Sequence, residues 1–106
     1  MQDKWQQSEI QAAKIYEGTK IPASGSQSDN KLDVQCGGSL ADYRIENKFT
    51  EKPAYRLTLE DLIKSEKHAL ITGNKCFRRL DFNGKCYIVI KESWFKEIAD
   101  AQKEDN

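Results

Sequence analysis

The middle of the chain shows the period-two pattern of a pair of strands. Residues 42–49 alternate between mainly apolar side chains on one side and charged side chains on the other, which is typical of a half-buried strand. A shorter strand is predicted at 31–36, and Gly37-Gly38 turn the chain between the two. The pattern therefore predicts a hairpin in the first half of the chain.

The strongest local signal is the dipeptide Asn83-Gly84, which lies between two largely apolar runs at 76–82 and 85–90. Asn-Gly favours a two-residue type I′ turn, which requires positive φ angles at both central residues. Both runs carry apolar residues on both faces, as expected for strands inside a sheet with helices packed on it. The turn sets a register with three cross-strand pairs: Leu80 with Tyr87, Arg78 with Val89, and Phe77 with Ile90.

Two longer segments show the 3.6-residue period of helices. The first runs over 5–16 and ends before Gly18. The second begins at Thr58, with Asp61 three residues on in a loose capping-box arrangement, and Gly73 ends it. We expect an apolar stripe of this second helix to pack into the core: Leu59, Leu62, Ile63, Glu66, Ala69 and Leu70.

The remaining predicted elements are an edge strand, a last helix and a C-terminal tail. Residues 19–22 are predicted to form an edge strand, because proline is confined to such places in sheets. Ser93 is expected to cap a last helix, whose Trp94-Phe95 pair serves either the core or a dimer contact. We expect residues 102–106 to form a frayed tail.

Between the edge strand and the first hairpin lies a polar segment at 23–30. We expect it to be a flexible loop. Ser24 and Ser26 flank a glycine, so backbone N–H groups and hydroxyls are free to approach a phosphate. The alternative is that the segment is a plain linker.

The chain has 106 residues, which suits one domain with a single core. Lys plus Arg and Asp plus Glu both number 17, and this neutral balance argues against a histone-like DNA binder. No apolar run approaches the roughly 20 residues of a membrane span, and the polar N-terminus is unlike a signal peptide. Three cysteines without a CxxC motif and a single histidine favour a cytoplasmic protein with reduced thiols and argue against structural zinc.

Asp33 and the tripeptide Glu46-Asn47-Lys48 form the candidate site. Glu46 and Lys48 point the same way, because side chains alternate along a strand. A symmetric hairpin would place Asp33 directly opposite Glu46, with Cβ atoms about 4.5–5.5 Å apart. Two carboxylates that close repel each other unless a cation lies between them, and oxygen ligands suit Mg²⁺. The alternative is a solvated sheet face with exposed ion pairs.

Glu9 falls in the middle of the inward face of the first helix, together with Trp5, Ala12 and Tyr16. A carboxylate on such a face is costly to bury without a partner. Two interpretations stay open. Glu9 lies at the edge of the stripe and snorkels or pairs with a lysine, or it turns toward the metal site.

The order of elements and the Asp…Glu-x-Lys spacing resemble the PD-(D/E)xK nuclease superfamily, and more closely the small Holliday junction resolvases of archaea and bacteriophages. The resemblance implies an α/β fold with a restriction-endonuclease-like core. In this fold a mixed central β-sheet is flanked by helices in the order α-β-β-β-α-β-β-α, as a single nuclease domain over 1–106. The segments that carry the resemblance are 8–14 before Gly18, 22–26, 32–34, 45–50 and 55–62.

The resemblance also implies a role for each site residue. The protein would be a metal-dependent endonuclease that hydrolyses DNA phosphodiester bonds as a Holliday junction resolvase. Asp33, Glu46 and the backbone carbonyl of Asn47 would bind Mg²⁺, for which Mn²⁺ would substitute. Lys48 would orient or activate the attacking water. Glu9 would complete the acidic cluster, directly or through a water.

DNA and a second subunit are the partners that the resemblance implies. Family members are two-fold dimers, each subunit cutting one of two opposed strands of a four-way junction, so we expect a cytoplasmic homodimer, in the host cytoplasm if phage-encoded. Neither a membrane nor a nucleotide cofactor is expected. Candidate DNA contacts are Ser24, Ser26, Lys31, Arg44, Lys52 and Arg56, with Arg78 and Arg79 as further basic candidates.

The chain departs from the family pattern in three ways. Leu32-Asp33 stands where Pro-Asp is usual, net charge is zero where many relatives are basic, and Asn47 occupies a usually apolar or Cys position. Asn47 therefore needs a hydrogen-bond partner if it points into the core. Two alternative functions stay open: a nicking or restriction-type nuclease on duplex or branched DNA, and a catalytically inert DNA-binding module of the same fold.

Overall fold

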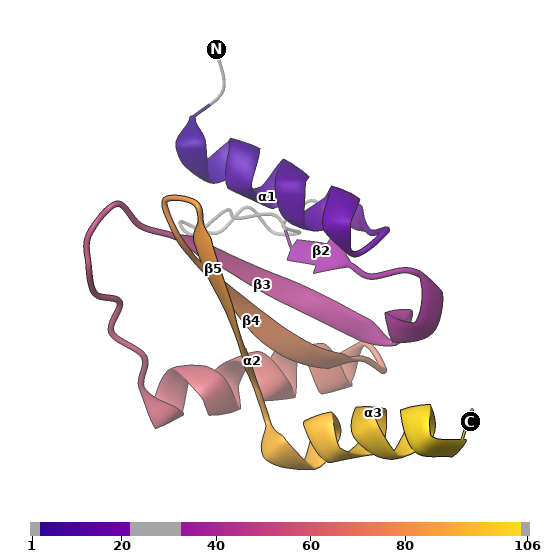
Figure 1. The fold of residues 1–106 in the computed structure, drawn as a ribbon. Coiled ribbons are helices and arrows are strands. Elements are labelled where there is room, and N and C mark those ends of the chain that lie inside the picture. The colour runs from indigo at the N-terminus through magenta and orange to yellow at the C-terminus, as the bar shows by residue number, and fades with distance from the viewer. Residues whose placement is uncertain (1–2, 22–32, 105–106) are drawn as a thin grey trace.

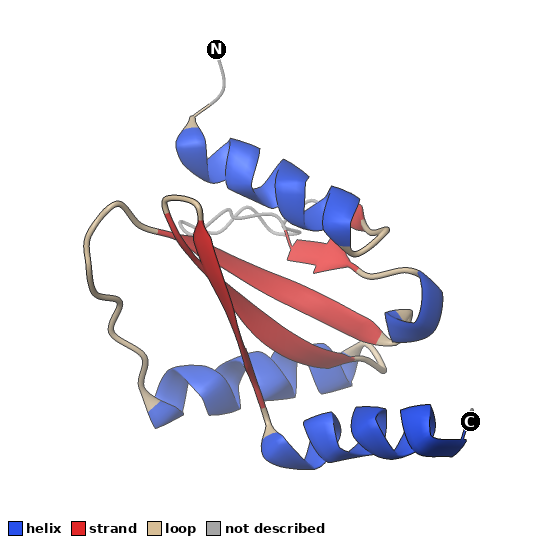
Figure 2. Cartoon of the chain, in the orientation of Figure 1, coloured by secondary structure: helices blue, strands red, loops and turns tan. Residues whose placement is uncertain are grey.

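The computed structural model describes residues 3–21 and 33–104. Their helices and strands follow the predicted order, with a short 3-10 helix added in the first hairpin turn (Figures 1 and 2). The elements are α1 (Lys4–Ile15), β1 (Thr19–Ile21), β2 (Asp33–Gln35), η1 (Gly38–Leu40), β3 (Tyr43–Phe49), α2 (Leu59–Ile71), β4 (Lys75–Phe82), β5 (Lys85–Ile90) and α3 (Glu92–Glu104).

The described strands form one sheet in the order β1-β2-β3-β4-β5. Neighbouring strands are antiparallel except β3 and β4, which are parallel. Parallel neighbours need a crossover connection, and α2 lies in that connection. The fold is therefore a mixed β-sheet flanked by helices, which confirms the predicted fold class.

The register of the first hairpin is the predicted one. Val34 pairs with Ile45 across β2 and β3. One position further along this register, Asp33 at the start of β2 falls opposite Glu46. Because the antiparallel register fixes which residues oppose each other, the backbone brings these two positions together as the sequence predicts.

The second hairpin is also confirmed, including all three predicted cross-strand pairs. Its turn residues Asn83 and Gly84 have φ angles of 53° and 110°, as a type I′ turn requires. The backbone N–H of Gly84 donates to Asp81 Oδ1 at 2.8 Å, which ties the turn to the preceding strand.

α1 and α2 cover opposite faces of the sheet (Figure 1). Two neighbouring residues of β3 demonstrate this, because adjacent strand residues point to opposite faces. Asn47 donates a hydrogen bond to Ser8 of α1, whereas Glu46 accepts one from Ser65 of α2. The candidate site and the α1 helix therefore lie on different sides of the sheet.

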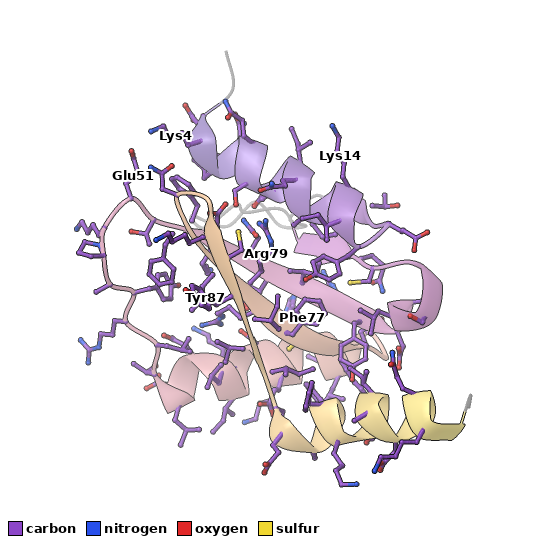
Figure 3. The ribbon with its side chains drawn as sticks, in the orientation of Figure 1. Lys4, Lys14, Glu51, Phe77, Arg79 and Tyr87 are labelled. Carbon is purple, nitrogen blue, oxygen red and sulfur yellow. The ribbon has the colours of Figure 1, made fainter. Side chains whose placement is uncertain are left out.

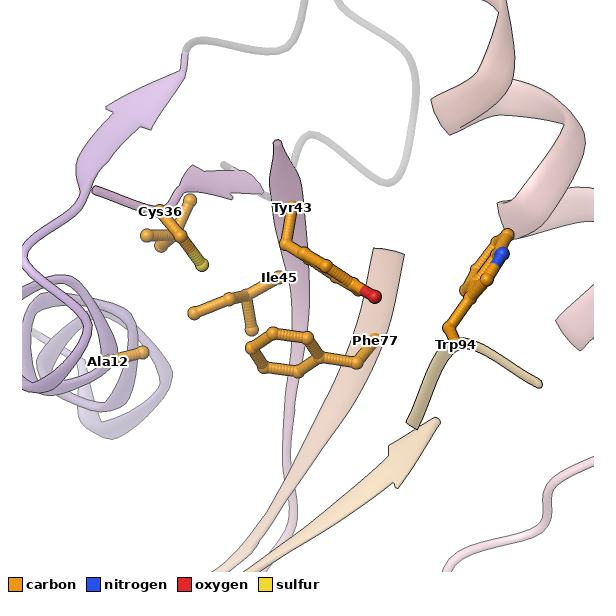
Figure 4. Close-up of a cluster of buried hydrophobic side chains, with 7 residues drawn as sticks. Ala12, Cys36, Tyr43, Ile45, Phe77 and Trp94 are labelled. Carbon is orange, nitrogen blue, oxygen red and sulfur yellow. The ribbon is translucent and has the colours of Figure 1, made fainter. Parts of the chain in front are cut away.

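The hydrophobic core forms where α1 packs against the sheet, and it extends to the start of α3 (Figure 4). The ring of Tyr43 links its two parts, with centroids 5.9 Å from Phe77 and 6.4 Å from Trp94. Trp94 is therefore a core residue, whereas Phe95 is exposed. The buried members are Ala12, Val34, Cys36, Tyr43, Ile45, Phe77 and Trp94.

The expectation that the stripe of α2 packs into the core is largely wrong. Of its residues only Ala69 is buried, while Leu59 is 72% exposed and Leu70 and Ile63 are also exposed. Leu59, Leu62 and Ile63 instead line an open pocket that α2 shares with β5 and α3. β5 is the last strand on this side of the described sheet, and its side chains are mostly exposed.

Two other expectations need correction. α3 begins at Glu92 rather than after Ser93, because the N–H groups of Trp94 and Phe95 already donate to the carbonyl of Lys91. The helix also continues to Glu104, through part of the expected frayed tail. The expected burial of both strands of the second hairpin holds only for β4. The side chains of β5 are mostly exposed.

Candidate functional site

Glu46 lies at the centre of a cluster of side chains from three elements. Lys48, two residues on along the same face of β3, places Nζ 3.2 Å from Glu46 Oε1. Arg78 of β4 donates from Nη2 to Glu46 Oε2 at 3.1 Å and to Ser65 Oγ at 2.7 Å. Ser65 of α2 in turn donates its hydroxyl to Glu46 Oε2. Strand alternation, the parallel register and the helix thus converge on one carboxylate.

The surroundings of Glu46 keep it ionised. Burial pushes its pKa up, but the hydrogen bond from Ser65 and the charges of Lys48 and Arg78 outweigh burial and hold the pKa below its ordinary value of 4.5. The carboxylate therefore carries its charge at neutral pH, with two cations beside it.

The sequence patterns do not single out Ser65, and they offer Arg78 only as a basic candidate for contact with DNA. Ser65 lies three residues after Leu62 and four before Ala69, so helical spacing puts it on the stripe of α2 that faces the sheet, and this signal was available. Arg78 meets Glu46 only because β3 and β4 pair in parallel across 32 residues. No local pattern encodes that pairing.

The structure brings Glu46 and Lys48 together as predicted, with Asp33 opposite Glu46 in the register. The side chain of Asp33 lies outside the described part. The same is true of the predicted DNA contacts Ser24, Ser26 and Lys31.

Of the remaining candidate DNA contacts, Arg44 is half-buried and the other two are exposed. Arg44 is on the Glu46 face of β3, where its Nη1 donates to Thr72 Oγ1 at 3.4 Å. Lys52 and Arg56 are exposed in the connection between β3 and α2.

On the opposite face, Asn47 finds the partners that a buried amide needs. Its Nδ2 donates to Ser8 Oγ at 2.9 Å, and its Oδ1 accepts from Arg79 Nη1 at 2.8 Å. Arg79 also donates to Ser8 Oγ at 3.2 Å and to Gln11 at 3.1 Å, while Ser8 donates to Asp81 Oδ2 at 2.5 Å. This network fastens the middle of Glu46-Asn47-Lys48 to α1.

Arg79 is therefore not a DNA contact, which corrects the expectation. Its side chain is 2% exposed and lies between α1 and the sheet (Figure 3). Arg78 is also enclosed and turned to Glu46. The spacing of basic residues on a strand gives no information about which of them a helix will cover.

Glu9 is 1% exposed, in a helix that packs on β2 and β3. Snorkelling at the edge of the stripe is therefore wrong, whereas pairing of Glu9 with a lysine stays a prediction. α1 covers the Asn47 face, so Glu9 approaches the sheet from the side opposite to the side chain of Glu46. Its part in the acidic cluster stays a prediction.

A pocket of about 350 Å³ opens beside Glu46 on the α2 side. Glu46, Ser65 and Arg78 form part of its lining, and an ion pair between Lys91 and Glu66 at 3.4 Å lies at another part. A pocket of this size lies within the range of small-ligand sites. Its apolar walls come from α2, β5 and α3: Leu59, Leu62, Ile63, Val89, Ile90 and Trp94.

Among the described side chains, no group of three or more His, Cys, Asp or Glu residues could hold a metal ion. The Asp33 carboxylate is not among these described side chains. Cys36, Cys76 and Cys86, all within the described residues, form no disulfide, as predicted. Burial, with Asp42 adding to it, raises the pKa of Cys36 to about 11, so this thiol stays protonated at neutral pH.

Comparison with protein-family models, with curated proteins and with solved structures finds no match. The family of the chain is therefore a hypothesis that rests on its own residues. In the described ranges, no helix has the length and apolar character needed to cross a membrane.

Proposed function

We propose that the chain is a metal-dependent endonuclease that hydrolyses DNA phosphodiester bonds, with the four-way Holliday junction as its substrate. One observation carries the proposal. Glu46 and Lys48 lie in contact on one face of β3, and the register of β2 sets Asp33 opposite Glu46. A metal held by such an acid pair would polarise a phosphate and lower the pKa of a bound water, and an adjacent lysine would offset the developing negative charge.

The donor set fits Mg²⁺, with Mn²⁺ as a substitute. Asp33, Glu46 and the backbone carbonyl of Asn47 are oxygen ligands of the hard type that these ions prefer. Glu46 is ionised, which metal binding requires. When bound, the metal supplies Lewis-acid polarisation of the phosphate and a water of lowered pKa.

The side chains of this protein orient the groups and balance their charge. Lys48 is partly exposed, and its ammonium group would turn from Glu46 toward an attacking water or a phosphate oxygen. There it offsets negative charge that develops during hydrolysis. The Ser8–Asn47–Arg79 network holds the backbone that carries both Glu46 and Lys48, so the spacing of the two is fixed.

Several partner contacts belong to the same proposal. Arg44, Lys52 and Arg56, together with Ser24, Ser26 and Lys31, would contact the DNA backbone. A cytoplasmic homodimer would cut two opposed strands, one in each subunit. The exposed ring of Phe95 supports a contact between subunits, since large exposed apolar groups are typical of interfaces.

The direct test is cleavage of a labelled four-way junction with and without Mg²⁺. We expect cutting only with the metal, and Lys48→Ala should lower the rate at least about 100-fold while junction binding changes little. Lys96→Ala is the matched control, because the one ion-pair partner of Lys96 among the described residues is Asp100 on the surface of α3. Absence of metal-dependent cutting by the unmodified protein on any DNA would refute the enzyme assignment.

The choice of DNA is tested in the same assay with a linear duplex and a flapped duplex of the same sequence. Preference for the junction supports the resolvase assignment. Equal or faster cutting of the linear duplex would identify a nicking or restriction-type nuclease instead.

One observation favours the rival function, an inert binding module. Glu46 is already satisfied by Lys48, Arg78 and Ser65, so the chain can retain this acid without using a metal. A calorimetric Mn²⁺ titration separates the two functions. Binding that Glu46→Gln removes supports the nuclease, and no binding supports the inert module.

A further inference from the structure

Arg78 is a second cation beside the carboxylate of the proposed metal site. Its side chain is 5% exposed, and its Nη2 donates to the same Glu46 oxygen, Oε2, to which Ser65 donates its hydroxyl. Its Nε is buried without a hydrogen-bond partner among the described residues. The guanidinium is thus held at one end and incompletely satisfied at the other.

Arg78 does for Glu46 what a bound metal would do, because it places a positive charge beside the carboxylate. A partly buried carboxylate is favoured by a positive partner, and the guanidinium of Arg78 supplies that partner inside the chain. A metal bound to Glu46 would supply the same compensation. Arg78 and the metal would then both lie close to the same carboxylate. Their mutual repulsion and their shared need for oxygen lone pairs oppose simultaneous binding.

We propose that Arg78 is an internal competitor for the metal: it holds Glu46 when no metal is bound and must release Oε2 before a metal can bind fully. This inference rests on the proposed metal site, which it deepens by naming what sets its affinity. The contact with Arg78 lowers the apparent affinity of the site for divalent metal, because Glu46 Oε2 must leave its ion pair with Arg78 before the metal can bind.

The pocket beside Glu46 gives the side chain of Arg78 room to move. Arg78 lines the pocket of about 350 Å³ beside Glu46, and the carboxylate of Glu66 lines the same pocket. A released guanidinium can therefore turn into this space and keep a carboxylate within the pocket. A fully packed core would not allow such a rearrangement, because close packing leaves no room for an arginine to reorient.

The experiment is a Mn²⁺ titration of the full chain without DNA, followed by calorimetry. Arg78→Met removes the cation but keeps an unbranched side chain, and Arg78→Lys keeps the charge on a group that lacks the planar fork. Lys96→Met removes one positive charge from the surface of α3 and controls for net charge. Glu46→Gln controls for binding at the site, and circular dichroism checks that each variant is folded.

We expect Arg78→Met to bind Mn²⁺ at least about tenfold more tightly than the unmodified protein, a change of about 1.4 kcal/mol. Arg78→Lys should lie between the two, and Lys96→Met should match the unmodified protein. Equal or weaker binding by Arg78→Met, with Glu46→Gln still abolishing it, would overturn the competition while the metal site stands. If Arg78→Met does not fold, Arg78→Lys binding as weakly as the unmodified protein overturns it instead. No Mn²⁺ binding by any variant would overturn the metal site and this inference with it.

Discussion

At the scale of single residues, Glu46 shows how one carboxylate couples the candidate chemistry to stability. Lys48, Ser65 and Arg78 all contact it, so its ionised form is favoured in the folded chain. Its pKa lies below 4.5 in the folded state and near 4.5 in the unfolded state. A group with a lowered folded-state pKa stabilises the fold above its unfolded pKa and loses that contribution as pH falls through the folded value.

This sign gives a prediction for acid unfolding. The unfolding free energy of the unmodified protein should decrease as pH falls below about 4.5, and Glu46→Gln should show a shallower decrease over the same range. Urea titrations at several pH values between 7 and 3 measure both slopes. Parallel pH dependence in the two proteins would contradict the ion pairs described for Glu46.

Three consecutive residues of β3 have different surroundings. Alternation along the strand predicts that Glu46 and Lys48 share a face and that Asn47 takes the other, and this is confirmed. The partners of each were not predictable in the same way. Arg78 and Arg79 are neighbours in sequence, yet one contacts Glu46 and the other contacts Asn47, because strand geometry sends them to opposite faces.

At the scale of elements, local sequence signals fix most boundaries. The Thr58 hydroxyl accepts from the N–H of Asp61 at 3.1 Å, so the predicted cap does begin α2. The Asn83-Gly84 turn also has its predicted conformation. Capping and turn formation depend on a few adjacent residues, which is why one sequence suffices for them.

The cap of α2 gives a second prediction. Thr58→Ala should lower the unfolding free energy by about 1 kcal/mol, because the N–H of Asp61 loses its acceptor at the helix start. Thr58→Ser keeps the hydroxyl and should remain within a few tenths of the unmodified value. Urea unfolding followed by circular dichroism measures the difference. If Thr58→Ser is destabilised as much as Thr58→Ala, the hydroxyl is not the stabilising group.

At the scale of the whole molecule, apolar side chains are unevenly distributed. The α1 side of the sheet encloses the core, whereas α2, β5 and α3 leave large apolar residues exposed around the pocket. Phe95 is 58% exposed on α3, next to the buried Trp94. A small domain with such a surface gains stability when a second copy covers it.

The proposed homodimer is tested by a change at that surface. We expect the unmodified protein to be dimeric at micromolar concentration and Phe95→Glu to be monomeric, because a charge at an apolar contact opposes association. Ile15→Glu is the matched control, since Ile15 is 56% exposed on α1. Light scattering after size exclusion gives the masses. A monomeric unmodified protein, or dissociation by Ile15→Glu alone, would argue against this interface.

The sequence by itself determined the elements, their order and the two hairpin registers, because these depend on periodicity and on turns of a few residues. It also determined that Glu46 and Lys48 share a face and that Asp33 stands opposite Glu46. These relations are local, so no distant part of the chain is needed to establish them.

Only the tertiary structure decided what surrounds the site. The parallel pairing of β3 with β4 brings Arg78 to Glu46, the packing of α2 adds Ser65, and α1 buries Glu9 and Arg79 on the other face. The pocket that part of the α2 stripe lines likewise depends on where β5 and α3 lie. Each depends on contacts between segments far apart in the chain, and single-sequence periodicity carries no information about which segments will meet.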